Sequence, residues 1–340
     1  MRRLLICADA SGQIGTGHVR RMLTFAGALS KLGACVTFQT SKLGAEILHA
    51  SAWHDKVVID KCDRSAVLRN LENAAYDGVI LDNYFWDATN EGPLRSKVPF
   101  IAAVDDLANR LHDVDFLIDQ NANQDPKAYD GLLPKHCVSV IGGSYCLLPS
   151  QFQKQRRSAV EQQEAPIFVS LGGGDPNSDL LDIVETLLSA TSLPLTIATG
   201  KHISDAVRLE EFAKRYKARI ELIFDSDHVA DQMEKSQFAV ASGGTMTWER
   251  ASMGLPSICL IVADNQVESS NWLAQRGYHL TFDLRNRWDR KSLADVVQSF
   301  AQNDSQRQRF SEKSVKLVAR DGAVRAARAL LDTLEQLTET

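Results

Sequence analysis

A histidine stands at position 18, directly behind a glycine-rich turn in the stretch GQIGTGHVRRM at 12–22. The apolar run LLIC precedes the turn and apolar residues at helical spacing follow it, so we expect a strand, a turn and a helix. Gly15 and Gly17 would let a ligand approach the backbone. The N–H groups at a helix start attract anions and disfavour a protonated imidazole. His18 is therefore a candidate general base; the alternative is a structural histidine that hydrogen-bonds a loop carbonyl.

The spacing of these glycines argues against a nicotinamide cofactor. The turn has the form G-x-x-G-x-G instead of G-x-G-x-x-G, and the next apolar run, VTFQTSK, does not end in the acidic residue that binds a ribose. No P-loop lysine follows this or any other glycine turn, which argues against an ATPase or a kinase. We predict that the protein uses no cofactor.

Two further glycine turns follow apolar runs in the second half of the chain, SLGGGD at 170–175 and SGGTMTWER at 242–250. Backbone N–H groups at a helix start suit a diphosphate. Glu249 lies one turn into the expected helix, where its carboxylate can bind a ribose; the alternative is a solvated acid on the helix surface. The candidate diphosphate-binding residues of the two turns are Gly173, Gly243, Gly244 and Thr245.

Polar side chains stand at several other expected strand ends. In the second half, Asn265 and Gln266 precede a helix, where their amides can bind hydroxyls or a phosphate, or simply cap the helix. The strand ends of the first half carry acids, amides and a tyrosine, some of which must be ordinary turn residues. Such groups suit a polyhydroxylated or amidated sugar better than an apolar ligand. They are Asp82, Tyr84, Asp105, Asn121 and Asn123.

Short apolar runs alternate with helical patterns along most of the chain, which predicts parallel sheets covered by helices on both faces. A polar, glutamine-rich stretch at 147–166 interrupts this alternation and is expected to link two lobes. We predict an α/β protein of two Rossmann-like, doubly wound lobes that face a cleft, at 1–150 and 165–315. A last helical segment at 316–340 is expected to pack across the lobe junction.

The bulk composition excludes several classes of protein. The 340 residues are 44% hydrophobic and 24% charged, and no segment approaches the roughly 18 consecutive apolar residues that span a bilayer. We therefore expect a cytoplasmic protein with no stable membrane insertion, and a monomer. The net charge of −5 argues against a protein that binds nucleic acid, because such proteins are usually strongly basic.

The six cysteines are scattered without a C-x-x-C pair, and the eight histidines show no H-E-x-x-H spacing. This pattern is typical of reduced, mostly structural thiols. We expect no metal site.

Together, the motifs GQIGTGHVRRM, ILDNY, NAN, SLGGGD and SGGTMTWERASMGLP resemble the nucleotide-sugar hydrolases of pseudaminic acid biosynthesis. The resemblance covers residues 1 to about 280, and the order of the motifs is more specific than any one of them. It implies a GT-B fold and a metal-independent, inverting hydrolysis that releases UDP and a free 2,4-diacetamido-2,4,6-trideoxy sugar.

Individual roles follow from the same resemblance. His18 matches the histidine that activates water, and Glu249 matches the glutamate that binds the ribose of a UDP-sugar. Gly243, Gly244 and Thr245 match the diphosphate loop. Tyr84 and Asn121 match positions near the sugar.

The same residues are compatible with three other functions. A GT-B glycosyltransferase would use His18 on an acceptor hydroxyl instead of water, and the paired-glycine loop fits it equally well. A nucleotide-sugar binding protein would bind without turnover. A 2-epimerase would call for more carboxylates in the cleft.

Overall fold

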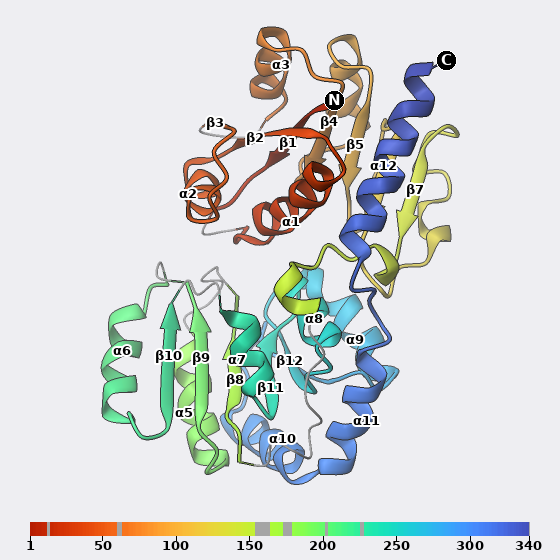
Figure 1. Cartoon of the computed structure of the whole chain (residues 1–340). Coiled ribbons are helices and arrows are strands. Elements are labelled where there is room, and N and C mark those ends of the chain that lie inside the picture. Colours follow the sequence, from red (N-terminus) through yellow and green to blue (C-terminus); the bar gives the residue numbers. More distant parts are fainter. Residues whose placement is uncertain are drawn as a thin grey trace. The chain divides into compact units, whose positions relative to one another are not determined.

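The structure is a computed structural model that describes residues 1–11, 14–59, 63–153, 164–172, 179–200, 203–224 and 228–339 (Figure 1). It divides into two compact units. The first unit comprises Met1–Pro149 and Ala319–Thr340, and the second comprises Ser150–Val318. The expected C-terminal segment at 316–340 is therefore divided, because Ala319 onward belongs to the first unit.

A parallel sheet with the strand order β3-β2-β1-β4-β5-β6-β7 forms the centre of the first unit. The order reverses between β1 and β4, where Ala8 pairs with Asp82. Ligands of open α/β sheets bind outside the carboxyl ends of the strands at such a switch point. The strands are β1 (Arg3–Ala8), β2 (Cys35–Thr40), β3 (Lys56–Val58), β4 (Gly78–Asp82), β5 (Ile101–Val104), β6 (Phe116–Asp119) and β7 (Val138–Ile141).

Helices cover both faces of this sheet. Leu4 and Ile6 of β1 pack with the helices α1 (Gly17–Lys31) and α12 (Gly322–Glu339), which contact each other. Leu5 points to the opposite face and joins a second core with α3 (Arg64–Asn73), as the two-residue period of a strand requires. The remaining helical elements are α2 (Lys42–Ala50), α4 (Ala88–Glu91), η1 (Gly92–Ser96), η2 (Pro126–Tyr129) and η3 (Gly143–Tyr145).

The second unit repeats this architecture around a parallel sheet with the order β10-β9-β8-β11-β12-β13. Its switch point lies between β8 and β11, where Ser170 pairs with Ala241. The strands are β8 (Ile167–Ser170), β9 (Leu195–Thr199), β10 (Ile220–Phe224), β11 (Phe238–Ser242), β12 (Ser257–Ile261) and β13 (Leu280–Asp283). The helices are η4 (Ser150–Gln153), α5 (Leu180–Ala190), α6 (Ala206–Arg215), α7 (Val229–Lys235), α8 (Thr245–Ser252), η6 (Asp264–Gln266), α9 (Val267–Gln275), α10 (Arg290–Gln302) and α11 (Asp304–Ser314).

The prediction of two doubly wound α/β units is confirmed. The sequence analysis did not predict β13. This short edge strand is only partly buried, and its sequence therefore lacks a continuous apolar run. Within the described ranges, no helix has the length and apolar character needed to span a bilayer.

Candidate functional site

His18 is the second residue of α1, at the switch point of the first unit, and only 7% of its side chain is exposed. Gly17 begins the helix, and Gly15 closes the preceding turn through hydrogen bonds with Ser11. Nδ1 of His18 lies 2.7 Å from Oδ1 of Asp82, the fully buried last residue of β4. Because an ionised carboxylate only accepts hydrogen bonds, this contact places the proton of a neutral His18 ring on Nδ1 and its lone pair on Nε2.

Arg21, one helical turn after His18, is the second partner of Asp82. Its Nε donates to Oδ2 at 2.7 Å and its Nη2 donates to Oδ1 at 2.5 Å. Burial alone would raise the pKa of Asp82, but the charges and hydrogen bonds of Arg21 and His18 outweigh it and lower the pKa to about 2. Asp82 is thus held ionised with both oxygens engaged. We expected it to bind substrate; it is instead fully buried, with its oxygens bound to His18 and Arg21.

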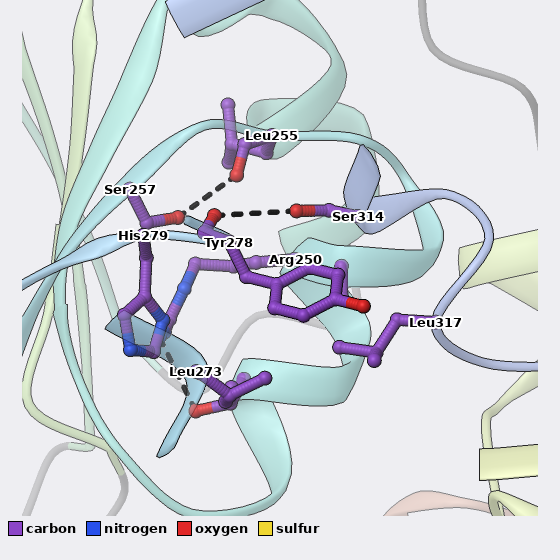
Figure 2. A pocket seen from close by; sticks show the side chains of 10 residues that line it. Arg250, Leu255, Ser257, Leu273, Tyr278, His279, Ser314 and Leu317 are labelled. Atoms are coloured by element: carbon purple, nitrogen blue, oxygen red, sulfur yellow. Dashed lines mark hydrogen bonds between the residues drawn. The ribbon is translucent and has the colours of Figure 1, made fainter. Parts of the chain in front are cut away.

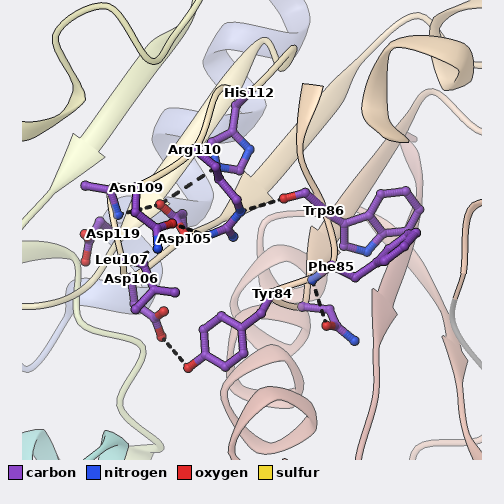
Figure 3. Close-up of polar contacts among 12 residues, drawn as sticks. Tyr84, Phe85, Trp86, Asp105, Asp106, Leu107, Asn109, Arg110, His112 and Asp119 are labelled. Atoms are coloured by element: carbon purple, nitrogen blue, oxygen red, sulfur yellow. Dashed lines mark hydrogen bonds and ion pairs between the residues drawn. The ribbon is translucent and has the colours of Figure 1, made fainter. Parts of the chain in front are cut away.

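Tyr84 and Asp106 extend this arrangement toward solvent. The Tyr84 ring packs edge-on against the His18 ring, with 5.1 Å between the centroids, and 38% of Tyr84 is exposed. Figure 3 shows its hydroxyl directed at Oδ2 of Asp106, at 3.4 Å. The same oxygen accepts a hydrogen bond of 3.0 Å from Nη1 of Arg21. Arg21 therefore links the carboxylate behind His18 to the one beside Tyr84, and neither Arg21 nor Asp106 was among the predicted site residues.

Asn121 lies next to Asp106, since its side-chain amide donates to the Asp106 carbonyl at 3.1 Å. Its backbone N–H donates to Oδ1 of Asp119 at 2.9 Å. The hydroxyl of Tyr129 lies 2.9 Å from Oδ2 of Asp119 and 3.0 Å from Oδ2 of Asp105. One hydroxyl proton cannot serve two ionised carboxylates at once. Burial raises the pKa of Asp119 to about 7, so Asp119 is the one of the two that holds a proton below about pH 7.

Asp105, which the sequence placed at the sugar-facing rim, is instead 1% exposed and structural. Nη1 of Arg110 lies 2.8 Å from its carboxylate, and the backbone N–H of Ala108 donates to it at 2.9 Å (Figure 3). Burial opposes its charge, but His112 and Arg110 outweigh burial and hold its pKa well below the usual range. Asp105 thus fixes the loop that carries Asp106. Asp106, the next residue along this loop, is the one that meets Arg21.

In the second unit, the paired glycines follow β11 at the switch point. Gly244 is the N-cap of α8 with φ of +89°, and the space beside its α-carbon is open. A side chain at Gly243 would meet Oε1 and Cβ of Gln266 at 3.1 Å. Oε1 of Gln266 also accepts a hydrogen bond from the backbone N–H of Val262 at 3.0 Å, so Gln266 supports the glycine loop from behind.

The other candidates of the second unit occupy neighbouring elements. Thr245 begins α8, and Glu249 is half-buried one turn further along that helix. Asn265 is exposed in η6. Gly173 lies outside the described residues. The remaining candidate of the first unit, Asn123, lies in the loop after β6.

A small cavity lies beside α8, lined among others by Arg250, Tyr278 and His279 (Figure 2). It has room for about one water molecule. Nε2 of His279 donates to the Ser270 carbonyl at 3.0 Å, and burial lowers the pKa of this imidazole to about 4. His279 is therefore neutral and structural. Across the described part of the chain, no group of three or more His, Cys, Asp or Glu residues is placed to hold a metal ion.

Comparison with known proteins gives distant relatives. No protein-family model matches the chain. The UDP-2,4-diacetamido-2,4,6-trideoxy-beta-L-altropyranose hydrolase of Campylobacter jejuni is 24% identical over 287 residues, which cover 82% of this chain and 99% of the relative. A spore coat polysaccharide biosynthesis protein of Bacillus subtilis is 21% identical over 355 positions, which cover 97% of this chain and 98% of the relative.

Solved structures match the fold over nearly the whole chain. The UDP-GlcNAc 2-epimerase from Neisseria meningitidis, bound to UDP-GlcNAc, gives a TM-score of 0.68 at 11% identity and covers 98% of this chain and 100% of that one. The glycotransferase of kitacinnamycin gives a TM-score of 0.69 at 16% identity, with 98% and 99% coverage. The fold is GT-B. Because the GT-B fold is common to a transferase and an epimerase, the reaction must be argued from the residues of the site.

Proposed function

We propose that the protein hydrolyses a UDP-linked 2,4-diacetamido-2,4,6-trideoxy sugar to UDP and the free sugar, with inversion at the anomeric carbon and without a metal ion. The observation that carries this proposal is the contact of 2.7 Å between Nδ1 of His18 and Oδ1 of Asp82, which orients the ring so that Nε2 can accept a proton when the imidazole is neutral. The relative from Campylobacter jejuni, whose name is that of this hydrolase, supports the choice of substrate.

In the proposed reaction, Nε2 of His18 accepts a proton from water as the water oxygen bonds to the anomeric carbon. The bond from that carbon to the diphosphate oxygen breaks, and its electron pair leaves with UDP. Asp82 stabilises the imidazolium that forms, while Arg21 keeps the carboxylate of Asp82 ionised and in place. One positioned base typically contributes about 10² to 10⁴ in rate.

The second unit is proposed to bind the nucleotide. The N–H groups at the start of α8 and the open backbone at Gly244 suit the diphosphate. Glu249, one turn along, would accept hydrogen bonds from the ribose hydroxyls. UDP is a stable leaving group, so these donors can take up its developing charge without a strong acid.

The deciding experiment incubates the protein with the UDP-linked diacetamido sugar and EDTA, without an acceptor, and follows UDP and the new anomer by NMR. Stoichiometric UDP and free sugar are expected, with the first-formed anomer of inverted configuration. Release that requires an added acceptor would instead identify a glycosyltransferase. Binding of the UDP-sugar without any release would identify a binding protein.

A further inference from the structure

Arg250 is a buried cation at the base of the proposed diphosphate loop. It lies in the second turn of α8 and is 1% exposed. Its Nη1 donates to the carbonyl of Ser242 at 3.0 Å, and Ser242 is the last residue of β11, immediately before Gly243. The guanidinium therefore ties α8 to the strand end from which the glycine loop begins.

No carboxylate within the described ranges lies at ion-pair distance from this guanidinium. Besides the Ser242 carbonyl, Nη2 approaches Oγ1 of Thr247 at 3.4 Å, while Nε is buried without a hydrogen-bond partner. Burial lowers the pKa of Arg250 by more than the nearby Cys259 and Glu249 raise it, whereas at Arg21 the charges of Asp82 and Asp106 outweigh burial. A buried charge that is only partly compensated costs free energy, and the cost falls when an opposite charge binds nearby.

We propose that Arg250 is a positioning residue for nucleotide diphosphates: it fixes the Gly243–Gly244 loop through Ser242 and supplies the positive charge that the bound diphosphate neutralises. The inference rests on the proposed function, in which the second unit binds UDP. Arg250 acts from behind the loop and makes no contact with the ligand itself.

Both the fixed loop and the positive charge of Arg250 should favour the phosphate groups of a ligand over its nucleoside. Field effects across a poorly screened interior act on charged ligand groups and leave neutral ones unaffected. The contribution of Arg250 should therefore grow from uridine to UMP to UDP. A merely structural arginine would change the affinities for all three ligands alike.

The test compares Arg250→Met, which removes the charge at similar volume, with Arg250→Lys, which keeps the charge. Arg307→Met is the control for loss of a buried arginine, because Arg307 is also 1% exposed but binds the carbonyls of Phe300 and Ala301 and the carboxylate of Asp304, away from the loop. Calorimetry gives the Kd of uridine, UMP and UDP for each protein, and thermal denaturation gives the Tm with and without UDP.

For Arg250→Met we expect the Kd of UDP to rise roughly tenfold or more, as for loss of a charge-assisted interaction, while the Kd of uridine stays within about twofold. The Tm without ligand should change little, because removal of the buried charge offsets the loss of the hydrogen bond to the Ser242 carbonyl. Arg250→Lys should keep most of the preference for UDP over uridine. Arg307→Met should change the Tm but not this preference.

Equal changes in the affinities for uridine and UDP would overturn the inference. If Arg250→Met does not fold, Arg250→Lys decides, and loss of its preference for UDP would count against the inference. A wild-type protein with no affinity for UDP would reject the proposed function instead, so the two failures are distinguishable.

Discussion

Nδ1 of His18 lies 2.7 Å from Oδ1 of Asp82, although 64 residues separate the two in the sequence. The contact depends on the strand order, because β1 and β4 are neighbours at the switch point of the first sheet. The loop after β1 leads to His18, and β4 ends at Asp82. The strand order of the sheet thus places the proposed base next to the carboxylate that orients it.

Replacement of His18 by asparagine should abolish most turnover and leave nucleotide binding intact. We expect kcat to fall by about 10² to 10⁴, the usual contribution of a general base, because water then lacks a proton acceptor. The affinity for UDP should be unchanged, since its proposed site is in the second unit. UDP release followed by NMR and calorimetry with UDP measure the two effects. His49→Asn, at an exposed position of α2, is the control; near wild-type turnover of His18→Asn would make His18 structural.

Asp82→Asn should lower turnover through its effect on His18. An amide no longer stabilises an imidazolium and can hold the ring in the wrong tautomer, so we expect kcat to fall roughly 10- to 1,000-fold with little change in KM. Arg21 keeps Asp106 as a partner, which should preserve the fold. Steady-state kinetics and a melting curve provide the check. A rise confined to KM would show that Asp82 serves substrate binding after all.

The sequence predicts the parts of this site better than their connections. Strand ends and glycine turns are local signals, so His18, Asp82 and Tyr84 could be found one by one. Arg21 was missed because its partner comes from a distant strand; the available signal was its spacing of three residues from His18, which places both on one face of the helix. The choice of Asp106 over Asp105 depends on side-chain direction at the end of β5, which residue types do not reveal.

Asp119 gives the stability of the protein a pH dependence. Burial raises its pKa to about 7 in the folded protein, whereas an exposed aspartic acid titrates near 3.8. Folding therefore takes up a proton between about pH 4 and pH 7, so the contribution of Asp119 to the free energy of unfolding falls as the pH rises through that window. In Asp119→Asn, the new amide can donate to Tyr129 at every pH. The Tm of the wild type should fall relative to that of Asp119→Asn between pH 4 and pH 7.

The pKa values of Asp82 and His112, also in the first unit, are shifted so that both groups titrate mainly outside this window. Asp82, with a pKa lowered to about 2, contributes stability that is present above about pH 4 and is lost as the pH falls through 2. Burial lowers the pKa of His112, but Asp105 and Glu91 outweigh it and raise the pKa to about 9. That contribution is complete below about pH 6.5 and is lost as the pH rises through 9. Both groups are common to the wild type and Asp119→Asn, so parallel Tm curves of the two proteins from pH 4 to 7 would refute the assignment of the proton to Asp119.

Glu249→Ala should weaken the binding of uridine and UDP by similar factors, because the ribose is common to both ligands. Loss of hydrogen bonds to a charged group typically costs about 1.5–3 kcal/mol, which corresponds to roughly 10- to 100-fold in Kd. This pattern differs from the one expected for Arg250→Met, where only the phosphorylated ligands lose affinity, so calorimetry with the same ligands separates the two residues of α8. Glu210→Ala, at an exposed position of α6, controls for the loss of a surface carboxylate. An unchanged Kd for uridine would mean that Glu249 is only a helix-surface acid and that another residue of the second unit binds the ribose.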